Sequence, residues 1–175
     1  MWARAQALAA AASDRREIAV AGTHGKTTTT AMIALVLERA GLDPTYVIGG
    51  DMNESGSGAH AGLGDLFVTE ADESDGSFLL LQPAIAIVTN IDADHLENYG
   101  GDFGRVRQAF ADFLHRLPFY GLAVMCIDDA ETAALARATP RNVMTCGESA
   151  EADVRASGLR ADAGTMYFDL HLPGR

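Results

Sequence analysis

One short stretch constrains this chain more than any other. The run GTHGKTTTT at residues 22–30 follows an apolar segment at 17–21 and precedes a segment at 27–40. The second segment has helical spacing in its apolar residues, which are Met32, Ile33, Val36, Leu37 and Ala40. A buried strand, a glycine-containing loop and a helix are therefore expected in this order. The unpaired N–H groups and the positive dipole end of such a helix point at an anion held by the loop.

The residue types in the loop fit a phosphate ligand. Gly22 and Gly25 let the backbone bend and approach closely, Lys26 can reach terminal phosphates, and the Thr27 hydroxyl is placed to ligate magnesium. The loop is shorter than the standard G-x-x-x-x-G-K-[ST] pattern, which would place a glycine at Val20. The predicted cofactor-binding residues are Gly22, Thr23, His24, Gly25, Lys26, Thr27 and Thr28.

Lys26 stands out in the composition, because the other twelve of the 13 basic residues are arginine. A compact ammonium suits a phosphate at this position better than a planar guanidinium. The structural alternative is an ordinary strand-to-helix turn with an incidental lysine. Spacing, context and residue types together favour phosphate binding.

Composition narrows the class of protein. A length of 175 residues with 48% hydrophobic residues predicts one globular domain. The chain has no apolar run near the ~20 residues that span a bilayer and no secretory signal pattern, so we expect a cytoplasmic protein without a membrane partner. The net charge of -11 argues against nucleic acid as a partner. Cys126 and Cys146 are expected to be reduced core residues.

Strand and helix patterns alternate along the chain. Strands are expected at 17–21, 45–48, 66–71, 84–89, 122–127 and 142–146, and helices at 2–12, 27–40, 102–117 and 130–138. This alternation predicts an α/β fold of the P-loop type, a parallel sheet with helices on both faces. Residues 1–16 are interpreted as a linker helix, 49–64 as a loop, and 152–172 as an appended antiparallel β-hairpin.

Two further residues are expected beside the loop. Glu70 lies near the end of the strand predicted at 66–71 and His95 follows the strand predicted at 84–89, and the carboxyl ends of parallel strands share one edge with Thr27. A hydroxyl, a carboxylate and an imidazole form a credible set of magnesium ligands, although imidazole is an unusual one. Purely structural roles are the alternative. At least two of the nearby acidic residues, which are Asp72, Glu73 and Asp75, are expected to be solvated.

Three long motifs carry a resemblance to a known family. GTHGKTTTT at 22–30, EADESDGSFL at 70–79 and NIDADHLENYGGDF at 90–103 together resemble the Mur ligases of peptidoglycan synthesis. The resemblance continues through FLHRLPFYGLAVMCIDD at 113–129 and covers nearly the whole chain from Glu17. Three motifs in the right order are far more specific than any one of them.

The branch of the family is indicated by single positions. The alanine-adding branch is the most similar, whereas the branch that recycles whole peptides typically has Tyr at the position of Ser74. Folylpolyglutamate synthases share the general plan but typically have Asn at the position of His24. Several Mur ligases hold a second metal with a carbamylated lysine. This chain has no lysine after Lys26, and the equivalent position falls near Phe110.

The resemblance implies a three-domain, ATP-dependent ligase in which residues 1–175 form the central ATPase domain. The domains for the UDP-sugar and the amino acid would lie outside this chain, as would an adenine contact after Arg175. The implied partners are ATP, UDP-N-acetylmuramate and L-alanine, with two Mg²⁺ ions. By position, Lys26 contacts phosphate, Thr27 and Glu70 ligate one magnesium, and His95 ligates the second. Lys26, Glu70 and His95 form the implied catalytic set.

The implied reaction joins a carboxylate to an amine through an acyl phosphate made with ATP. Two alternatives stay open, an ordinary P-loop kinase or ATPase and a nucleotide-binding module without catalysis. The isolated chain is expected to bind ATP weakly and not to ligate, because positioning of the two reactants supplies much of the rate.

Overall fold

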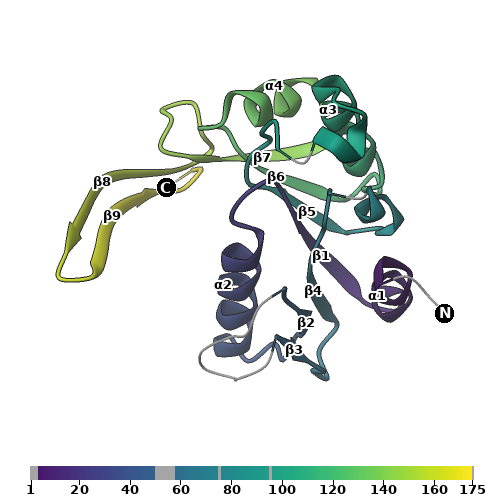
Figure 1. Cartoon of the computed structure of the whole chain (residues 1–175). Coiled ribbons are helices and arrows are strands. Elements are labelled where there is room, and N and C mark those ends of the chain that lie inside the picture. The colour runs from purple at the N-terminus through teal and green to yellow at the C-terminus, as the bar shows by residue number, and fades with distance from the viewer. Residues whose placement is uncertain (1–3, 50–57, 75, 95, 175) are drawn as a thin grey trace.

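The computed structural model describes residues 4–49, 58–74, 76–94 and 96–174, and its strands form one sheet (Figure 1). The described strands are β1 (Arg16–Ala21), β2 (Thr45–Val47), β3 (Ala59–His60), β4 (Leu66–Glu70), β5 (Ile85–Val88), β6 (Leu122–Cys126), β7 (Asn142–Gly147), β8 (Val154–Asp162) and β9 (Thr165–His171). The described helices are α1 (Arg4–Ala12), α2 (Lys26–Arg39), α3 (Phe103–His115) and α4 (Ala130–Ala138), with 3₁₀ turns η1 (Ser77–Leu80) and η2 (Leu96–Tyr99).

The sheet order is β3-β2-β4-β1-β5-β6-β7-β8-β9. From β2 to β8 all neighbouring strands are parallel, while β3 pairs antiparallel with β2 and β9 pairs antiparallel with β8. The predicted α/β fold is therefore confirmed, with the antiparallel hairpin continuing the sheet. The register aligns Val20 with Glu70 and Ala21 with Val88, so β1, β4 and β5 end at the same edge.

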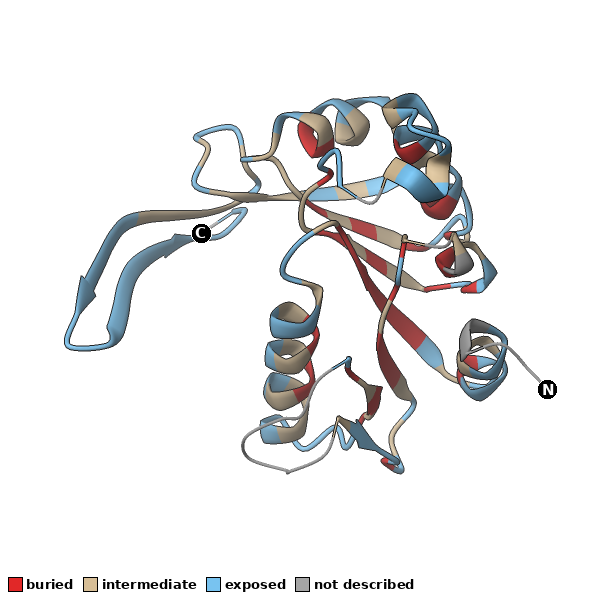
Figure 2. Ribbon diagram, viewed as in Figure 1, coloured by how far each residue is buried: buried red, intermediate tan, exposed pale blue. Residues whose placement is uncertain are grey.

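Helices cover both faces of the sheet, as the sequence predicts (Figure 2). On one face, Ala19, Ala86 and Ala123 form a fully buried row across β1, β5 and β6. These small side chains leave room for the larger core residues of α3, among them Phe110 and Phe113. On the other face, α2 packs on a smaller cluster around Ile18, Val68 and Tyr46.

Tertiary packing decides which side of α2 is buried. Met32 and Val36 are 56% and 65% exposed, and the buried positions of α2 are Thr30 and Ala34. Apolar residues occur nearly all round this helix, so their spacing does not single out one face. The Thr30 hydroxyl can be buried because it donates to the carbonyl of Lys26 at 2.8 Å.

Two smaller expectations need correction. The segment predicted as a loop at 49–64 contains the short strand β3, because Tyr46 and Val47 pair with its two residues, and 50–57 lies outside the described residues. Cys126 and Cys146 are free thiols, but they are only partly buried where β6 meets β7. Burial is still sufficient to raise the pKa of Cys146 to about 11.

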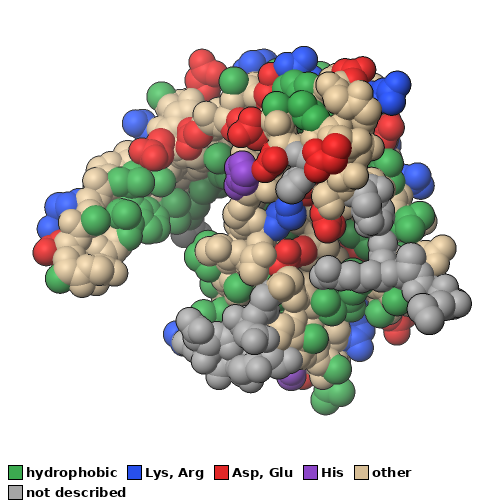
Figure 3. Space-filling view, in the orientation of Figure 1, with side chains coloured by type: hydrophobic (Ala, Val, Ile, Leu, Met, Phe, Trp, Pro, Cys, Tyr) green, Lys and Arg blue, Asp and Glu red, His purple; other side chains and the backbone are tan. Residues whose placement is uncertain are grey.

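The hairpin of β8 and β9 extends beyond the helices (Figure 1), within the expected range of 152–172. Its register places Ala156 opposite Leu170 and Ala161 opposite Met166, so apolar side chains share one face. Figure 3 shows hydrophobic side chains gathered along this hairpin. Every residue of β9 is exposed. None of the helices that the structure describes has the length and apolar character needed to cross a bilayer.

Candidate nucleotide-phosphate site

The loop between β1 and α2 has the backbone that the glycines predict. Gly22 and Gly25 have φ angles of 136° and 82°, a region that other residues rarely adopt. A Cβ on Gly22 would overlap the Thr89 hydroxyl, whereas a Cβ on Gly25 would meet nothing within 4 Å. Gly25 is the N-cap of α2, and no described side chain caps it. The first N–H groups of α2 therefore face outward without a side-chain acceptor.

Residues that follow β5 hold this loop in shape. The Asn90 side chain accepts from the His24 N–H at 2.8 Å and donates to the His24 carbonyl at 3.0 Å. The Thr89 hydroxyl donates to the same carbonyl at 2.7 Å, and the Thr23 hydroxyl accepts from the Asp92 N–H at 2.9 Å. Sequence reasoning did not predict this role for Thr89, Asn90 or Asp92. Their position directly after a strand that ends at the same edge of the sheet was the signal that could have identified them.

Of the predicted loop residues, His24 takes part in this arrangement through its main chain. Its ring is exposed and lies 3.7 Å from the Asp92 carboxylate. Thr27 and Thr28 are exposed on the first turn of α2. The Thr27 hydroxyl is therefore open to a ligand or a metal ion.

Lys26 is held inside the site by a carboxylate that sequence reasoning did not single out. Its ammonium donates to the Gly22 carbonyl at 2.7 Å and to Glu73 Oε1 at 3.0 Å, and it lies 2.9 Å from Glu73 Oε2. The two side chains are only 17% and 6% exposed. Asp72 is exposed, Glu73 is buried and Asp75 lies outside the described residues, so solvation of at least two of the three stays a prediction.

Glu70 ends β4 beside β1, at the edge where the loop lies. Its carboxylate accepts from the Gly49 N–H at 2.6 Å. Figure 3 shows acidic side chains gathered over this edge of the sheet. His95 lies outside the described residues, so its position relative to Glu70 and Thr27 stays a prediction.

The oxygen atoms at this edge are of the kind that magnesium prefers. They include the exposed Thr27 hydroxyl, the Glu70 carboxylate and Glu73 Oε2, which is buried and accepts no hydrogen bond from the part of the chain that the structure describes. Among the described residues, no group of three or more His, Cys, Asp or Glu side chains is already gathered for a metal ion. The residues present fit a cation that is also held by phosphate oxygens.

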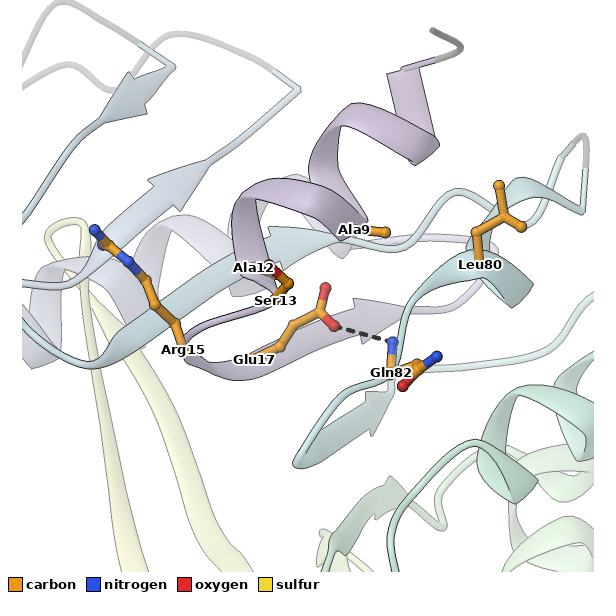
Figure 4. A pocket seen from close by; sticks show the side chains of 7 residues that line it. All are labelled: Ala9, Ala12, Ser13, Arg15, Glu17, Leu80 and Gln82. Atoms are coloured by element: carbon orange, nitrogen blue, oxygen red, sulfur yellow. Dashed lines mark hydrogen bonds between the residues drawn. The ribbon is translucent and has the colours of Figure 1, made fainter.

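A separate cavity of about 230 Å³ lies at the opposite end of β1, between α1 and η1 (Figure 4). It is lined by Ala9, Ala12, Ser13, Arg15, Glu17, Leu80 and Gln82. Glu17 accepts from the Gln82 N–H at 3.1 Å, and its other oxygen has no hydrogen bond to any described residue. Arg15 points away and donates to the Gly62 carbonyl at 3.1 Å. Burial raises the pKa of Glu17 to about 7, although the hydrogen bond from Gln82 acts in the opposite direction.

A parallel sheet with a glycine loop, a lysine and a helix N-terminus at its carboxyl edge defines the phosphate-loop class of α/β domains. The family model described as the Mur ligase middle domain matches residues 20–175, and the chain belongs to the Mur ligase family.

Comparison with curated relatives indicates which branch of the Mur ligase family this chain resembles. The chain is 62% identical over 170 residues to UDP-N-acetylmuramate–L-alanine ligases of Stenotrophomonas maltophilia (strain K279a) and Xanthomonas campestris pv. campestris (strain B100). Each match covers 97% of this chain and 36% of the relative. The chain thus spans about a third of the length of these relatives.

Solved structures show the same fold. The UDP-N-acetylmuramate:L-alanyl-γ-D-glutamyl-meso-diaminopimelate ligase from Neisseria matches with a TM-score of 0.84 and 28% identity, over 98% of this chain and 56% of that one. The UDP-N-acetylmuramate–alanine ligase MurC from Thermotoga maritima matches with a TM-score of 0.78 and 33% identity, over 92% of this chain and 35% of that one.

Proposed function

We propose that this chain binds ATP as the central domain of a UDP-N-acetylmuramate–L-alanine ligase in bacterial cytoplasm. The observation that carries the proposal is the position of Lys26, whose ammonium lies over the loop at the N-terminus of α2. An anion placed there would meet the helix N–H groups and the single lysine of the chain together. The 62% identity to ligases with this activity supports the choice of branch.

Each residue has a defined role in the proposal. Lys26 binds the transferring phosphoryl group, and the N–H groups from Gly25 to Thr28 bind phosphate oxygens. Thr27 and Glu70 hold one Mg²⁺, and His95 helps to hold a second. When bound, Mg²⁺ would supply positive charge next to the transferring oxygens.

The chemistry follows from what a carboxylate needs to react with an amine. The carboxylate of UDP-N-acetylmuramate attacks the γ-phosphorus of ATP, which forms an acyl phosphate and releases ADP. The amine of L-alanine then attacks the acyl carbon, the amide bond forms, and inorganic phosphate leaves. In the first step Lys26 stabilises the charge on the phosphoryl oxygens.

The two other substrates are proposed to bind to domains outside this chain. A central domain of this kind supplies the site for the nucleotide phosphates. The relatives are nearly three times as long as this chain, so they have room for further substrate-binding domains. The exposed apolar face of the hairpin, with Met166, Phe168 and Leu170 each more than half exposed, supports packing against further protein.

Two measurements test the proposal. Calorimetric titration of the chain with ATP and MgCl₂ should show binding at one site, and absence of binding would refute the nucleotide assignment. With the longer protein, mass spectrometry should detect UDP-N-acetylmuramoyl-alanine when L-alanine is the amine. Product formed only with L-alanyl-γ-D-glutamyl-meso-diaminopimelate would assign the recycling branch instead. Phosphate release without either amine or sugar would favour an ordinary ATPase.

A further inference from the structure

The buried pair of Lys26 and Glu73 occupies the centre of the phosphate site. We propose that Glu73 is the internal counterion of Lys26 in the nucleotide-free protein, and that it makes nucleotide binding depend on a divalent cation. The inference rests on the proposed function, because it assumes that the ligand of the loop is a nucleotide phosphate.

The first support is the saturation of Lys26. An ammonium has three N–H donors, and here they are directed at the carbonyls of Gly22 and Thr23 and at Glu73 Oε1, while Glu73 Oε2 lies 2.9 Å away as an ion-pair contact. Both side chains are largely shielded from water, which strengthens a charged pair relative to a surface pair. A phosphate oxygen that reaches Lys26 therefore shares the ammonium with Glu73 or displaces one of its three acceptors.

The second support is that the Glu73 main chain is fixed. Its carbonyl accepts from the Gly76 N–H at 3.0 Å, in a turn where Gly76 has a φ of 71°. The same carbonyl accepts from the Tyr99 hydroxyl, which η2 supplies. The carboxylate is thus presented to Lys26 by a constrained segment, so a ligand cannot remove it simply by moving a loose loop.

The third support is the chemistry of the second carboxylate oxygen. Glu73 Oε2 is buried and accepts no hydrogen bond within the described residues. When a phosphate pairs with the Lys26 ammonium, the Glu73 carboxylate loses its counterion and lies next to another anion. This arrangement is unfavourable in a site that is shielded from water. A divalent cation that arrives with the nucleotide restores the balance, because carboxylate and phosphate oxygens are both ligands of Mg²⁺. Nucleotide without a cation has to compete with Glu73.

The test compares ATP binding with and without magnesium by calorimetric titration of the whole chain. In the Glu73→Gln variant we expect the affinity for ATP in EDTA to rise by about tenfold. We expect a much smaller gain in MgCl₂, so the ratio of the two dissociation constants falls. The matched control is Asp72→Asn, which removes the same charge from the same segment. Asp72 is suitable because its side chain is exposed and accepts a hydrogen bond from the Ser74 N–H. It should change either affinity less than twofold.

A second variant separates charge from contact. Glu73→Asp keeps the carboxylate but shortens its reach and loosens its contact with Lys26, so its affinity for metal-free ATP should rise above wild type by a smaller factor than that of Glu73→Gln. Melting curves establish that the variants fold, and Glu73→Asp carries the comparison if Glu73→Gln does not. Unchanged or weaker metal-free binding by the folded variants overturns the inference alone. Failure of the wild type to bind ATP with magnesium overturns the proposed function as well.

Discussion

The Asn90 side chain forms two hydrogen bonds with the His24 main chain, accepting from its N–H at 2.8 Å and donating to its carbonyl at 3.0 Å. Asn90 follows β5 and His24 follows β1, and these two strands are parallel neighbours in the sheet. The shape of the phosphate loop is therefore fixed by the next strand and by its own glycines. This arrangement leaves the outer N–H groups of the loop available to a ligand.

Replacing Asn90 should weaken nucleotide binding more than it weakens the fold. Asn90→Ala removes both hydrogen bonds to His24, and we expect a loss of roughly 1 to 2 kcal/mol in the binding of ATP with magnesium. Calorimetric titration measures this loss. Asn142→Ala is the matched control, because its amide donates to the Gly121 carbonyl at 3.1 Å, where β6 and β7 begin. Equal affinities for both variants would contradict the role given to Asn90.

Lys26→Ala should abolish detectable ATP binding and should also lower the stability of the chain. The buried Glu73 carboxylate loses its counterion, which costs roughly 1 to 3 kcal/mol of the free energy of unfolding. The double variant Lys26→Ala/Glu73→Gln should recover most of this stability and still fail to bind ATP. Urea unfolding and ATP titration of wild type, Lys26→Ala, Glu73→Gln and the double variant form a double-mutant cycle. A double variant no more stable than Lys26→Ala would show that the pair does not contribute in this way.

The two loop glycines should differ in their cost of replacement. Gly22→Ala and Gly25→Ala both force a residue with Cβ to a positive φ angle, which costs about 1 to 2 kcal/mol. Gly22→Ala adds an overlap with the Thr89 hydroxyl, whereas Gly25→Ala meets open space. We expect Gly22→Ala to be clearly the less stable variant in urea unfolding. Equal stabilities would mean that Thr89 can move away at little cost.

Stability should fall as pH rises through the titration of Glu17. Its pKa is raised from 4.5 to about 7 in the folded chain, so the folded state holds a proton that the unfolded state has released between these values. The free energy of unfolding therefore decreases from about pH 4.5 to about pH 7, by roughly 3 kcal/mol in total. Glu17→Gln removes this loss.

The expected result is that Glu17→Gln equals wild type in stability at pH 4 and exceeds it at pH 8. Urea unfolding at both pH values measures the difference, with the exposed Glu151→Gln as the control for a simple loss of charge. A constant difference between Glu17→Gln and wild type across this pH range would rule out titration of Glu17 as the cause.

Local features of the sequence determined the order of strands and helices and the position of the phosphate loop. The apolar runs that form β1, β4, β5 and β6 are short and bounded by polar or glycine residues. Helix α2 begins at Lys26, one position before the predicted start. The three motifs beginning at Gly22, Glu70 and Asn90 together sufficed to indicate the family. Glu70 could be assigned to the correct edge because parallel strands end together.

Tertiary structure decided which side chains meet. Glu73 is 47 positions from Lys26, and only strand register and the turn at Gly76 distinguish it from the other acidic residues of its segment. The buried side of α2 was likewise fixed by packing, because its apolar residues surround the helix. Hydrophobic spacing and glycine positions act over a few residues and can be read along the chain. Pairing of charges depends on distances in space, which exist only after the sheet has set its register.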